Sequence, residues 1–170
     1  MVQIDYALRM WVITHRVVAL DNLFWFLSLV GRGGMVWLGI GACVAIARRR
    51  VHAFTIVLFA VLIASTLANT IIKPVVNRTR PFEVLAGEVI GGRPHDASFP
   101  SGHSANAFAG AAILARIAPG GAIGWWTLAA AIAFSRVYLG VHYPLDVIGG
   151  AVVGLVSAWI ALRLTRFSEL

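Results

Sequence analysis

The stretch Val51–Ile72 reads VHAFTIVLFAVLIASTLANTII and contains no aspartate, glutamate, lysine or arginine. A helix needs roughly 20 apolar residues to cross the hydrocarbon layer of a bilayer. Backbone groups must be satisfied internally in lipid, and an unbroken apolar run favours a helix over a strand of a β-barrel. This stretch therefore predicts a membrane-spanning helix.

Four further stretches lack the same charged residues and reach a spanning length when their flanks are included. They are Gly33–Ala47, Ser104–Ala115, Ile117–Ser135 and Val147–Leu162. Gly150 and Gly154 in the last stretch either let a neighbouring helix approach closely or are merely tolerated in a membrane helix. The sequence therefore predicts an all-α, polytopic membrane helix bundle with five clear spans.

The first 30 residues leave two interpretations open. Arg9, Arg16 and Asp21 interrupt an otherwise apolar segment. The segment is either an interfacial amphipathic helix followed by a short re-entrant piece, or a sixth span. We favour a sixth membrane-embedded element, which would complete six helices in one domain over residues 1–170.

The composition of the chain supports a membrane protein. Of its 170 residues, 59% are hydrophobic and 12% are charged, and the mean hydropathy is +0.84. This charged share is about half of that in soluble domains, and such high hydrophobicity excludes a disordered chain. A single cysteine, Cys43, excludes a disulfide scaffold. The net charge of +7 comes from arginines at span ends, so we expect no nucleic-acid partner.

The basic residues between the predicted spans suggest an orientation. Six arginines are expected on one side of the bundle: Arg48, Arg49, Arg50, Arg116, Arg163 and Arg166. The positive-inside rule assigns this side, with the C-terminus, to the cytoplasm. Residues 73–102 and 137–146 then lie at the extracytoplasmic face of the plasma (inner) membrane. That face is also basic, which agrees with the rule only if its cations serve chemistry.

Three polar clusters are predicted at this outer face, where charged residues are candidates for function. In the first cluster, Lys73 is the only lysine of the chain, and Arg80 follows seven residues later. An ammonium and a planar guanidinium can bind different oxygens of one phosphate. The alternative is that both side chains only extend to the lipid headgroups.

The second cluster opens a predicted helix. Ser101 has the chemistry of an N-cap, Gly102 lets a ligand approach the backbone, and free N–H groups at a helix N-terminus bind anions. His103 would lie in the first turn and face such an anion. The alternative is an ordinary capped helix with a surface histidine.

The third cluster pairs a histidine with a carboxylate. His142 and Asp146 are four residues apart, so the carboxylate can hold the imidazole in one tautomer, and Arg136 lies just upstream. A structural bond at a helix cap is the alternative. Together the three clusters indicate displacement on the phosphorus of an anionic substrate, without a metal ion or cofactor. One histidine would be the nucleophile and the other a general acid, in either order.

The spacing of these residues resembles the type 2 phosphatidic acid phosphatase superfamily. Residues 73–81 match its pattern of Lys, six residues and Arg-Pro, and residues 100–103 match Pro-Ser-Gly-His. Residues 135–146 match Ser-Arg, five residues, His, three residues and Asp. The resemblance covers roughly residues 73–146 and implies a metal-independent membrane phosphatase with six helices and a phosphohistidine intermediate.

The resemblance also implies a role for each matching residue. His142 would attack phosphorus, Asp146 would orient it, and His103 would protonate the leaving oxygen and later activate water. The residues that would hold the phosphoryl oxygens are Lys73, Arg80, Ser101, Gly102 and Arg136.

The likeness also suggests a substrate, a lipid phosphate or pyrophosphate. Residues 94–101 and 142–144 are similar to undecaprenyl pyrophosphate phosphatases of the bacitracin-resistance type, although some of these carry Asp at the position of Gly102. Phosphatidylglycerol phosphate, phosphatidic acid, lipid A and prenyl-phosphoribose phosphatases are the alternatives. Other residues of the polar segments are expected to be solvated or to line the entrance to the site, namely Asn77, Arg78, Arg93 and His95.

Two other classes of protein fit less well. Vanadate-dependent haloperoxidases share the motifs but resemble soluble proteins, whereas this chain has five apolar stretches. A non-catalytic lipid-phosphate binding or transport protein would not require the His142–Asp146 pair together with His103.

Overall fold

The structure is a computed structural model that describes residues 2–85 and 87–165. Every regular element within these residues is a helix, which confirms the all-α prediction. The elements are α1 (Val2–Thr14), η1 (Val18–Leu20), α2 (Asp21–Val30), η2 (Arg32–Gly34), α3 (Met35–Ala47), α4 (Val51–Ser65), the π-helical η3 (Thr66–Ile72), α5 (Lys73–Val76), α6 (Pro81–Val84), α7 (Gly102–Ile117), η4 (Pro119–Gly121), α8 (Ala122–Tyr138) and α9 (Pro144–Leu164).

Five of these elements, α3, α4, α7, α8 and α9, occupy the five apolar stretches of the sequence. The continuous segment Val51–Val84 and α9 are each long and apolar enough to cross a membrane. The fourth stretch begins later than predicted, at Ala122, because Pro119 starts a short 3₁₀ turn after α7.

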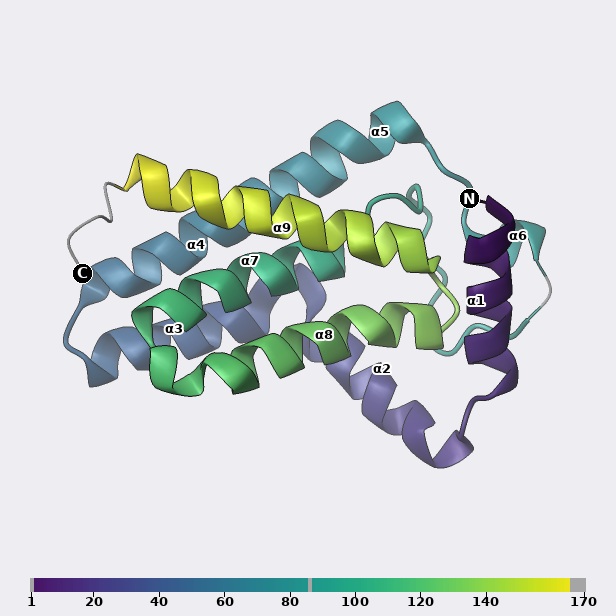
Figure 1. The fold of residues 1–170 in the computed structure, drawn as a ribbon, viewed down its shortest axis with the longest axis horizontal. Helices are drawn as coiled ribbons and strands as arrows, with labels where there is room; N and C mark the ends of the chain where they lie inside the picture. Colours follow the sequence, from purple (N-terminus) through teal and green to yellow (C-terminus); the bar gives the residue numbers. More distant parts are fainter. Residues whose placement is uncertain (1, 86, 166–170) are drawn as a thin grey trace.

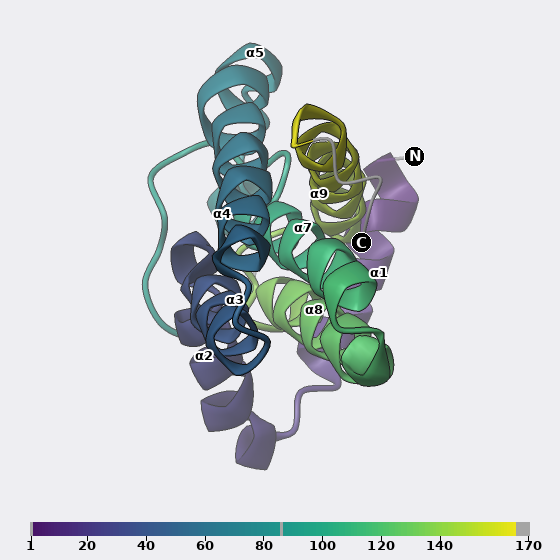
Figure 2. The same cartoon turned by 90° about the vertical axis from the view of Figure 1, so that its left-hand side faces the viewer.

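Helix α7 lies at the centre of the bundle, and α3, α4, α8 and α9 pack around it (Figure 2). Small residues permit this packing. A Cβ atom added to Gly150 would lie 2.4 Å from the carbonyl oxygen of Ser101, and one on Gly154 would lie 2.3 Å from that of Ala105. The expected close approach at these two glycines is confirmed, and it brings the N-terminus of α9 next to that of α7.

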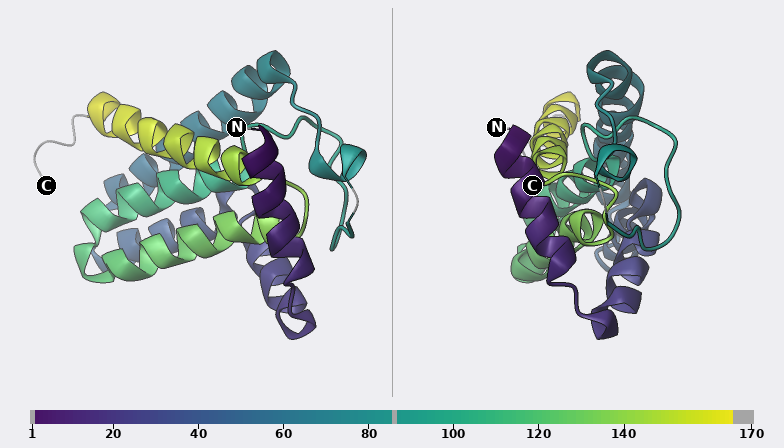
Figure 3. Two further views of the ribbon diagram at one scale, coloured as in Figure 1. Left: turned by 45° about the vertical axis from the view of Figure 1, so that its right-hand side comes forward. Right: turned by 90° about the vertical axis from the view of Figure 1, so that its right-hand side faces the viewer.

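The N-terminal segment forms two helices in place of one straight span. The bend between α1 and α2 is 96°, and the pair passes as a membrane span only if it is counted as one bent element. Helix α1 crosses the ends of α8 and α9, whereas α2 packs obliquely against α8 (Figures 1 and 3). At the bend, Arg16 donates hydrogen bonds to the carbonyl oxygens of Tyr138 and Glu88, at 2.7 and 2.8 Å. The first 30 residues therefore close one end of the bundle.

The other end of the bundle is basic. Arg48–Arg50 connect α3 to α4, Arg116 is in the last turn of α7, and Arg163 is in the last turn of α9 (Figure 1). These arginines lie together, as the sequence predicts, at the end away from α1. Arg166, the sixth of the predicted group, is outside the described residues.

Candidate active site

Six of the eight predicted site residues line one cavity of about 170 Å³. They are Lys73, Arg80, Gly102, His103, Arg136 and His142. The three polar clusters, far apart in the sequence, thus meet at the end of the bundle that α1 covers. Asp146 contacts His142, and the backbone N–H of Ser101 donates to the carbonyl oxygen of Asp146 at 2.9 Å.

Asp146 is fully buried and accepts hydrogen bonds on both carboxylate oxygens. Oδ2 accepts from His142 Nδ1 at 3.4 Å, from the Tyr143 N–H at 2.9 Å and from Ser98 Oγ at 2.5 Å. Because Nδ1 donates to Asp146, the lone pair of His142 lies on Nε2, which Arg80 Nη1 approaches at 3.4 Å. The predicted contact between His142 and Asp146 is present, and it leaves Nε2 as the ring nitrogen that carries the lone pair.

His142 lies in the turn between α8 and α9, and its charged form is disfavoured there. Burial is the largest cause that lowers the pKa of His142, and the charges of Arg80 and Arg136 act in the same direction. The hydrogen bond to Asp146 opposes them, and the resulting pKa is about 3. His142 is therefore neutral near pH 7 and carries the lone pair that a nucleophile needs.

Ser28 of α2 connects the other histidine to a cation. His103 Nε2 donates to the carbonyl oxygen of Ser28 at 3.1 Å, and Arg136 Nη1 donates to Ser28 Oγ. Since a carbonyl only accepts hydrogen bonds, this contact assigns the proton of neutral His103 to Nε2 and makes Nδ1 the nitrogen that can exchange a proton. The N-terminal segment thus orients two residues of the site.

Asp96 forms ion pairs with both cations of the first cluster, Lys73 and Arg80. Its carboxylate pairs with Lys73 Nζ and with Arg80 Nη2, the latter at 2.7 Å, and its carbonyl accepts from Arg80 Nε at 2.7 Å. Burial tends to raise the pKa of Asp96, but hydrogen bonds and charge from Lys73 and Arg80 lower it to about 2. Asp96 is therefore an anion at any pH above about 3, at the place where an anionic ligand would bind.

The start of α7 is built as the sequence predicts. Ser101 is its N-cap, and its hydroxyl accepts from the Ser104 N–H at 3.4 Å. A Cβ atom added to Gly102 would lie 2.5 Å from Asn69 Oδ1, so a larger residue here would displace the Asn69 amide. The hydroxyl of Ser101 is fully buried and is not part of the cavity wall.

Two asparagines also line the cavity and were missed by the sequence analysis. Asn69 lies in η3, where the wider π-helical turn precedes Lys73, and such turns are frequent at functional sites. Asn106 Oδ1 on α7 is buried and has no hydrogen-bond partner among the described residues. Both lie in apolar helical runs, and a lone amide in such a run is the signal that could have identified them.

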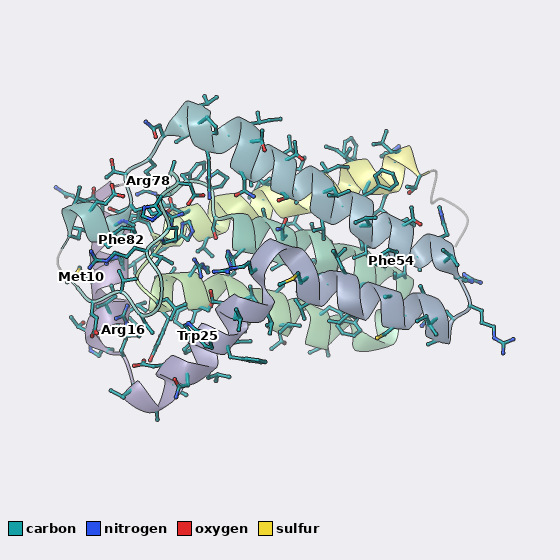
Figure 4. The ribbon with its side chains drawn as sticks, turned by 180° about the vertical axis from the view of Figure 1, so that it is seen from behind. Met10, Arg16, Trp25, Phe54, Arg78 and Phe82 are labelled. Carbon is teal, nitrogen blue, oxygen red and sulfur yellow. The ribbon has the colours of Figure 1, made fainter. Side chains whose placement is uncertain are left out.

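Arg78, expected to be a solvated loop or entrance residue, is instead a partly buried link between two buried carboxylates. It donates to Asp146 Oδ1 at 2.6 Å and to Asp5 Oδ2 of α1, and its guanidinium lies 4.1 Å from the ring centre of Tyr143. Asp5 Oδ1 also accepts from the Leu145 N–H, at 2.9 Å, in the first turn of α9. Figure 4 shows Arg78 at the end of the molecule opposite Phe54. Helix α1 is thereby fastened to the carboxylate that orients His142.

Replacing Arg78 with glutamine should destabilise the protein by about 3 kcal/mol, because two buried carboxylates would lose the cation between them. The midpoint of thermal unfolding in detergent measures this loss. Arg116→Gln, at the basic end of the bundle, is the matched control and should change little. The double variant Asp5→Asn/Arg78→Gln should lose less than the sum of the two single losses. A strictly additive result would contradict the link.

The charged groups of the cavity are mainly cations. Within residues 2–85 and 87–165, no three His, Cys, Asp or Glu side chains gather as ligands for a metal ion. Lys73, Arg80 and Arg136 instead provide fixed positive charge beside the imidazoles of His103 and His142. Such an arrangement can bind a phosphoryl group and stabilise the charge that shifts during its transfer.

The chain is similar in sequence and fold to known proteins. The family model described as the PAP2 superfamily matches residues 53–169. The chain is 34% identical over 156 residues to the Undecaprenyl-diphosphatase of Sulfolobus acidocaldarius, covering 88% of this chain and 73% of that protein. It is 36% identical over 120 residues to the Lipid A 4'-phosphatase of Porphyromonas gingivalis, covering 66% of this chain and 51% of that protein.

A solved structure extends the likeness to the fold. The crystal structure of Aquifex aeolicus LpxE superposes with a TM-score of 0.79 and 27% sequence identity, covering 92% of this chain and 93% of that one. The family match over residues 53–169 includes most of α4 and all the elements from η3 to α9, and therefore every motif residue of the cavity. The chain thus belongs to the PAP2 superfamily and is a membrane lipid phosphatase.

Proposed function

We propose that this protein removes the terminal phosphate of undecaprenyl diphosphate at the extracytoplasmic face of the membrane, without a metal ion and through a phosphohistidine. The observation that carries the proposal is the convergence of Lys73, Arg80 and Arg136 with His142 and His103 around one cavity. Fixed cations can supply the charge stabilisation for which other phosphatases use a metal ion.

In the first step, Nε2 of His142 attacks phosphorus and the bond to the leaving oxygen breaks. His103, which carries a second proton on Nδ1 when the substrate is bound, transfers that proton to the leaving oxygen, so that a phosphohistidine and a neutral His103 remain. Asp146 accepts from Nδ1 and stabilises the positive charge that develops on the His142 ring.

In the second step, His103 removes a proton from water, and the hydroxide attacks phosphorus and releases His142. The same cations hold the phosphoryl oxygens in both steps, together with the Gly102 N–H at the start of α7. Ser101 would contribute by holding this helix terminus in place through its cap.

The substrate assignment draws on the relatives. The similarity to the Undecaprenyl-diphosphatase of Sulfolobus acidocaldarius covers 88% of this chain, whereas that to the Lipid A 4'-phosphatase covers 66%. The Lipid A 4'-phosphatase of Porphyromonas gingivalis keeps lipid A as a second candidate. The identity to the Lipid A 4'-phosphatase is slightly higher, 36% against 34%, but the aligned region is shorter, 120 residues against 156.

For the membrane topology, we propose that α3, α4 with η3, α7, α8 and α9 span the bilayer and that the bent α1–α2 pair is the sixth element. The end that carries Arg48–Arg50 and Arg163 would face the cytoplasm. The cavity lies at the opposite end and would then face a lipid carrier left outside after cell-wall synthesis.

The test compares phosphate release by purified protein in detergent with excess chelator. Undecaprenyl diphosphate, phosphatidylglycerol phosphate, phosphatidic acid and lipid A serve as substrates at equal surface concentration. We expect release that chelator does not affect and that is fastest with undecaprenyl diphosphate. Loss of activity in chelator would contradict the metal-free mechanism, and a different fastest substrate would replace the substrate assignment.

Asp96→Asn should tighten inhibition by inorganic phosphate by about fivefold, because a carboxylate that competes for Lys73 and Arg80 becomes neutral. Its half-exposed position limits the effect. The inhibition constant is measured from pH 6 to 8, where the low pKa of Asp96 keeps the wild-type carboxylate ionised throughout. Asp21→Asn, away from the cavity, is the control. Weaker or unchanged inhibition in Asp96→Asn would show that Asp96 does not compete with the anion.

A further inference from the structure

A second cavity, of about 340 Å³, adjoins the first. Both are lined by Pro94, His103 and Arg136, whereas His142 lines only the smaller one. Sites for small organic ligands have volumes of about 300 Å³ or more, which the larger cavity reaches. A phosphoryl group beside His142 would thus have its leaving group on the side of His103, in the larger cavity.

The larger cavity combines cations with an apolar wall. Arg32 of η2 and Arg93 of the loop between α6 and α7 line this cavity and not the smaller one. Trp25, Leu29 and Ile90 provide apolar surface beside them. Neither arginine has a role in the two chemical steps above. Their guanidinium groups suit a second anionic group that is joined to a hydrocarbon chain.

The loop that carries Arg93 is held in place by contacts with α8 and α2. The Ile90 N–H donates to the carbonyl oxygen of Leu139 at 3.2 Å, at the end of α8. Gly91 has a φ of +87°, and a Cβ atom there would lie 3.1 Å from Trp25 Cδ1 of α2. The Arg93 guanidinium lies 5.6 Å from the ring centre of Phe82. A preformed subsite of this kind lowers the entropy lost on binding.

Extending the proposed lipid phosphatase activity, we propose that Arg32 and Arg93 form a subsite for the inner phosphate of a prenyl diphosphate. When His142 attacks the terminal phosphorus, the bridging P–O bond breaks and its electron pair goes to the inner phosphate, which His103 protonates. The leaving group is then an anion whose charge grows in the transition state, and both guanidinium groups stabilise it. A monophosphate instead releases a neutral alcohol, which needs no such cations. The two arginines would therefore select diphosphates over monophosphates.

The experiment compares kcat/KM for farnesyl diphosphate and farnesyl monophosphate in detergent. Arg32→Gln/Arg93→Gln should lower kcat/KM for the diphosphate by about 10- to 100-fold, since each lost contact is a charged hydrogen bond. The value of kcat/KM for the monophosphate should change by less than about threefold, because the monophosphate has no inner phosphate for the two arginines to contact. Arg116→Gln is the control for loss of an arginine charge, and Arg32→Lys/Arg93→Lys, which keeps the charge, should recover part of the loss.

A binding measurement makes the subsite testable without turnover. Calorimetry gives the affinities of a non-hydrolysable farnesyl methylenebisphosphonate and of farnesyl phosphonate for wild type and for the double glutamine variant. We expect the variant to lose affinity for the bisphosphonate alone. Equal losses for both ligands, or no loss for either, would overturn the subsite. If the wild type releases no phosphate from either farnesyl compound, the proposed function fails, and the binding result still decides whether Arg32 and Arg93 recognise the second phosphate.

Discussion

Replacing His142 with alanine is expected to lower kcat for a lipid phosphate by about 10⁴-fold or more, as for the loss of other covalent nucleophiles. The geometry supplies the reason, since Nδ1 is directed to Asp146 and Nε2 faces Arg80 in the cation-lined cavity. Phosphate release from purified protein measures the effect. Wild-type enzyme quenched during turnover of a ³²P-labelled substrate should carry label, and the variant should carry none.

His52→Ala is the matched control for the loss of His142, because this exposed histidine lies in α4 at the basic end of the bundle. It should retain wild-type activity. The neutral state of His142 also predicts that its titration does not set the acid limb of kcat/KM above about pH 4, given its pKa of about 3. Substantial turnover by His142→Ala, or label on that variant, would show that another residue attacks phosphorus.

Replacing His103 with alanine is expected to lower kcat for a lipid substrate by about 10²- to 10⁴-fold, the range typical of a lost general acid and base. A substrate with a good leaving group, such as p-nitrophenyl phosphate, needs no proton transfer to depart. The variant should therefore still form phosphoenzyme from this compound but hydrolyse it slowly, because His103 no longer activates water.

The diagnostic result for His103→Ala is accumulation of labelled protein beyond the wild-type level during steady state. Rapid-quench labelling and the burst of p-nitrophenol measure it directly. Ser28→Ala is a useful comparison, since it removes the hydroxyl that holds Arg136 but keeps the carbonyl that accepts from His103. If His103→Ala lost labelling and hydrolysis equally, its loss would not slow hydrolysis of the phosphoenzyme more than its formation, and the proposed role of His103 would be wrong.

Much of this fold could be predicted from hydrophobicity alone. The uncharged run before Lys73 predicts one continuous helical segment, and the structure contains it. The glycine pair at 150 and 154 predicts a close helix contact, which α7 provides. The bend after α1 was not predicted, because Arg16 interrupts the apolar pattern in the same way whether a segment bends or lies on the surface.

The motif residues of the cavity could also be named from the sequence, whereas their partners could not. Asp5 meets Leu145 across 140 positions of sequence and Asp96 meets Lys73 across 23, and no local periodicity records such pairings. Arg78 was expected to be solvated because its neighbours are polar, yet its guanidinium lies between two buried carboxylates. Long-range ion pairs depend on how the helices assemble, and a single sequence carries little information on that assembly.

The ion pairs of Asp96 also bear on how quickly the site can empty. Hydrolysis leaves inorganic phosphate among the cations that held the substrate, and product release limits turnover in many enzymes. Asp96 lies beside Lys73 and Arg80, so its carboxylate can pair with them again as the phosphate departs. The two cations then do not remain without a counter-charge inside an apolar bundle. Under the proposed function, competition by Asp96 lowers the affinity of the site for phosphate and speeds the release of the product. Rapid release suits an enzyme whose carrier lipid must be recycled many times.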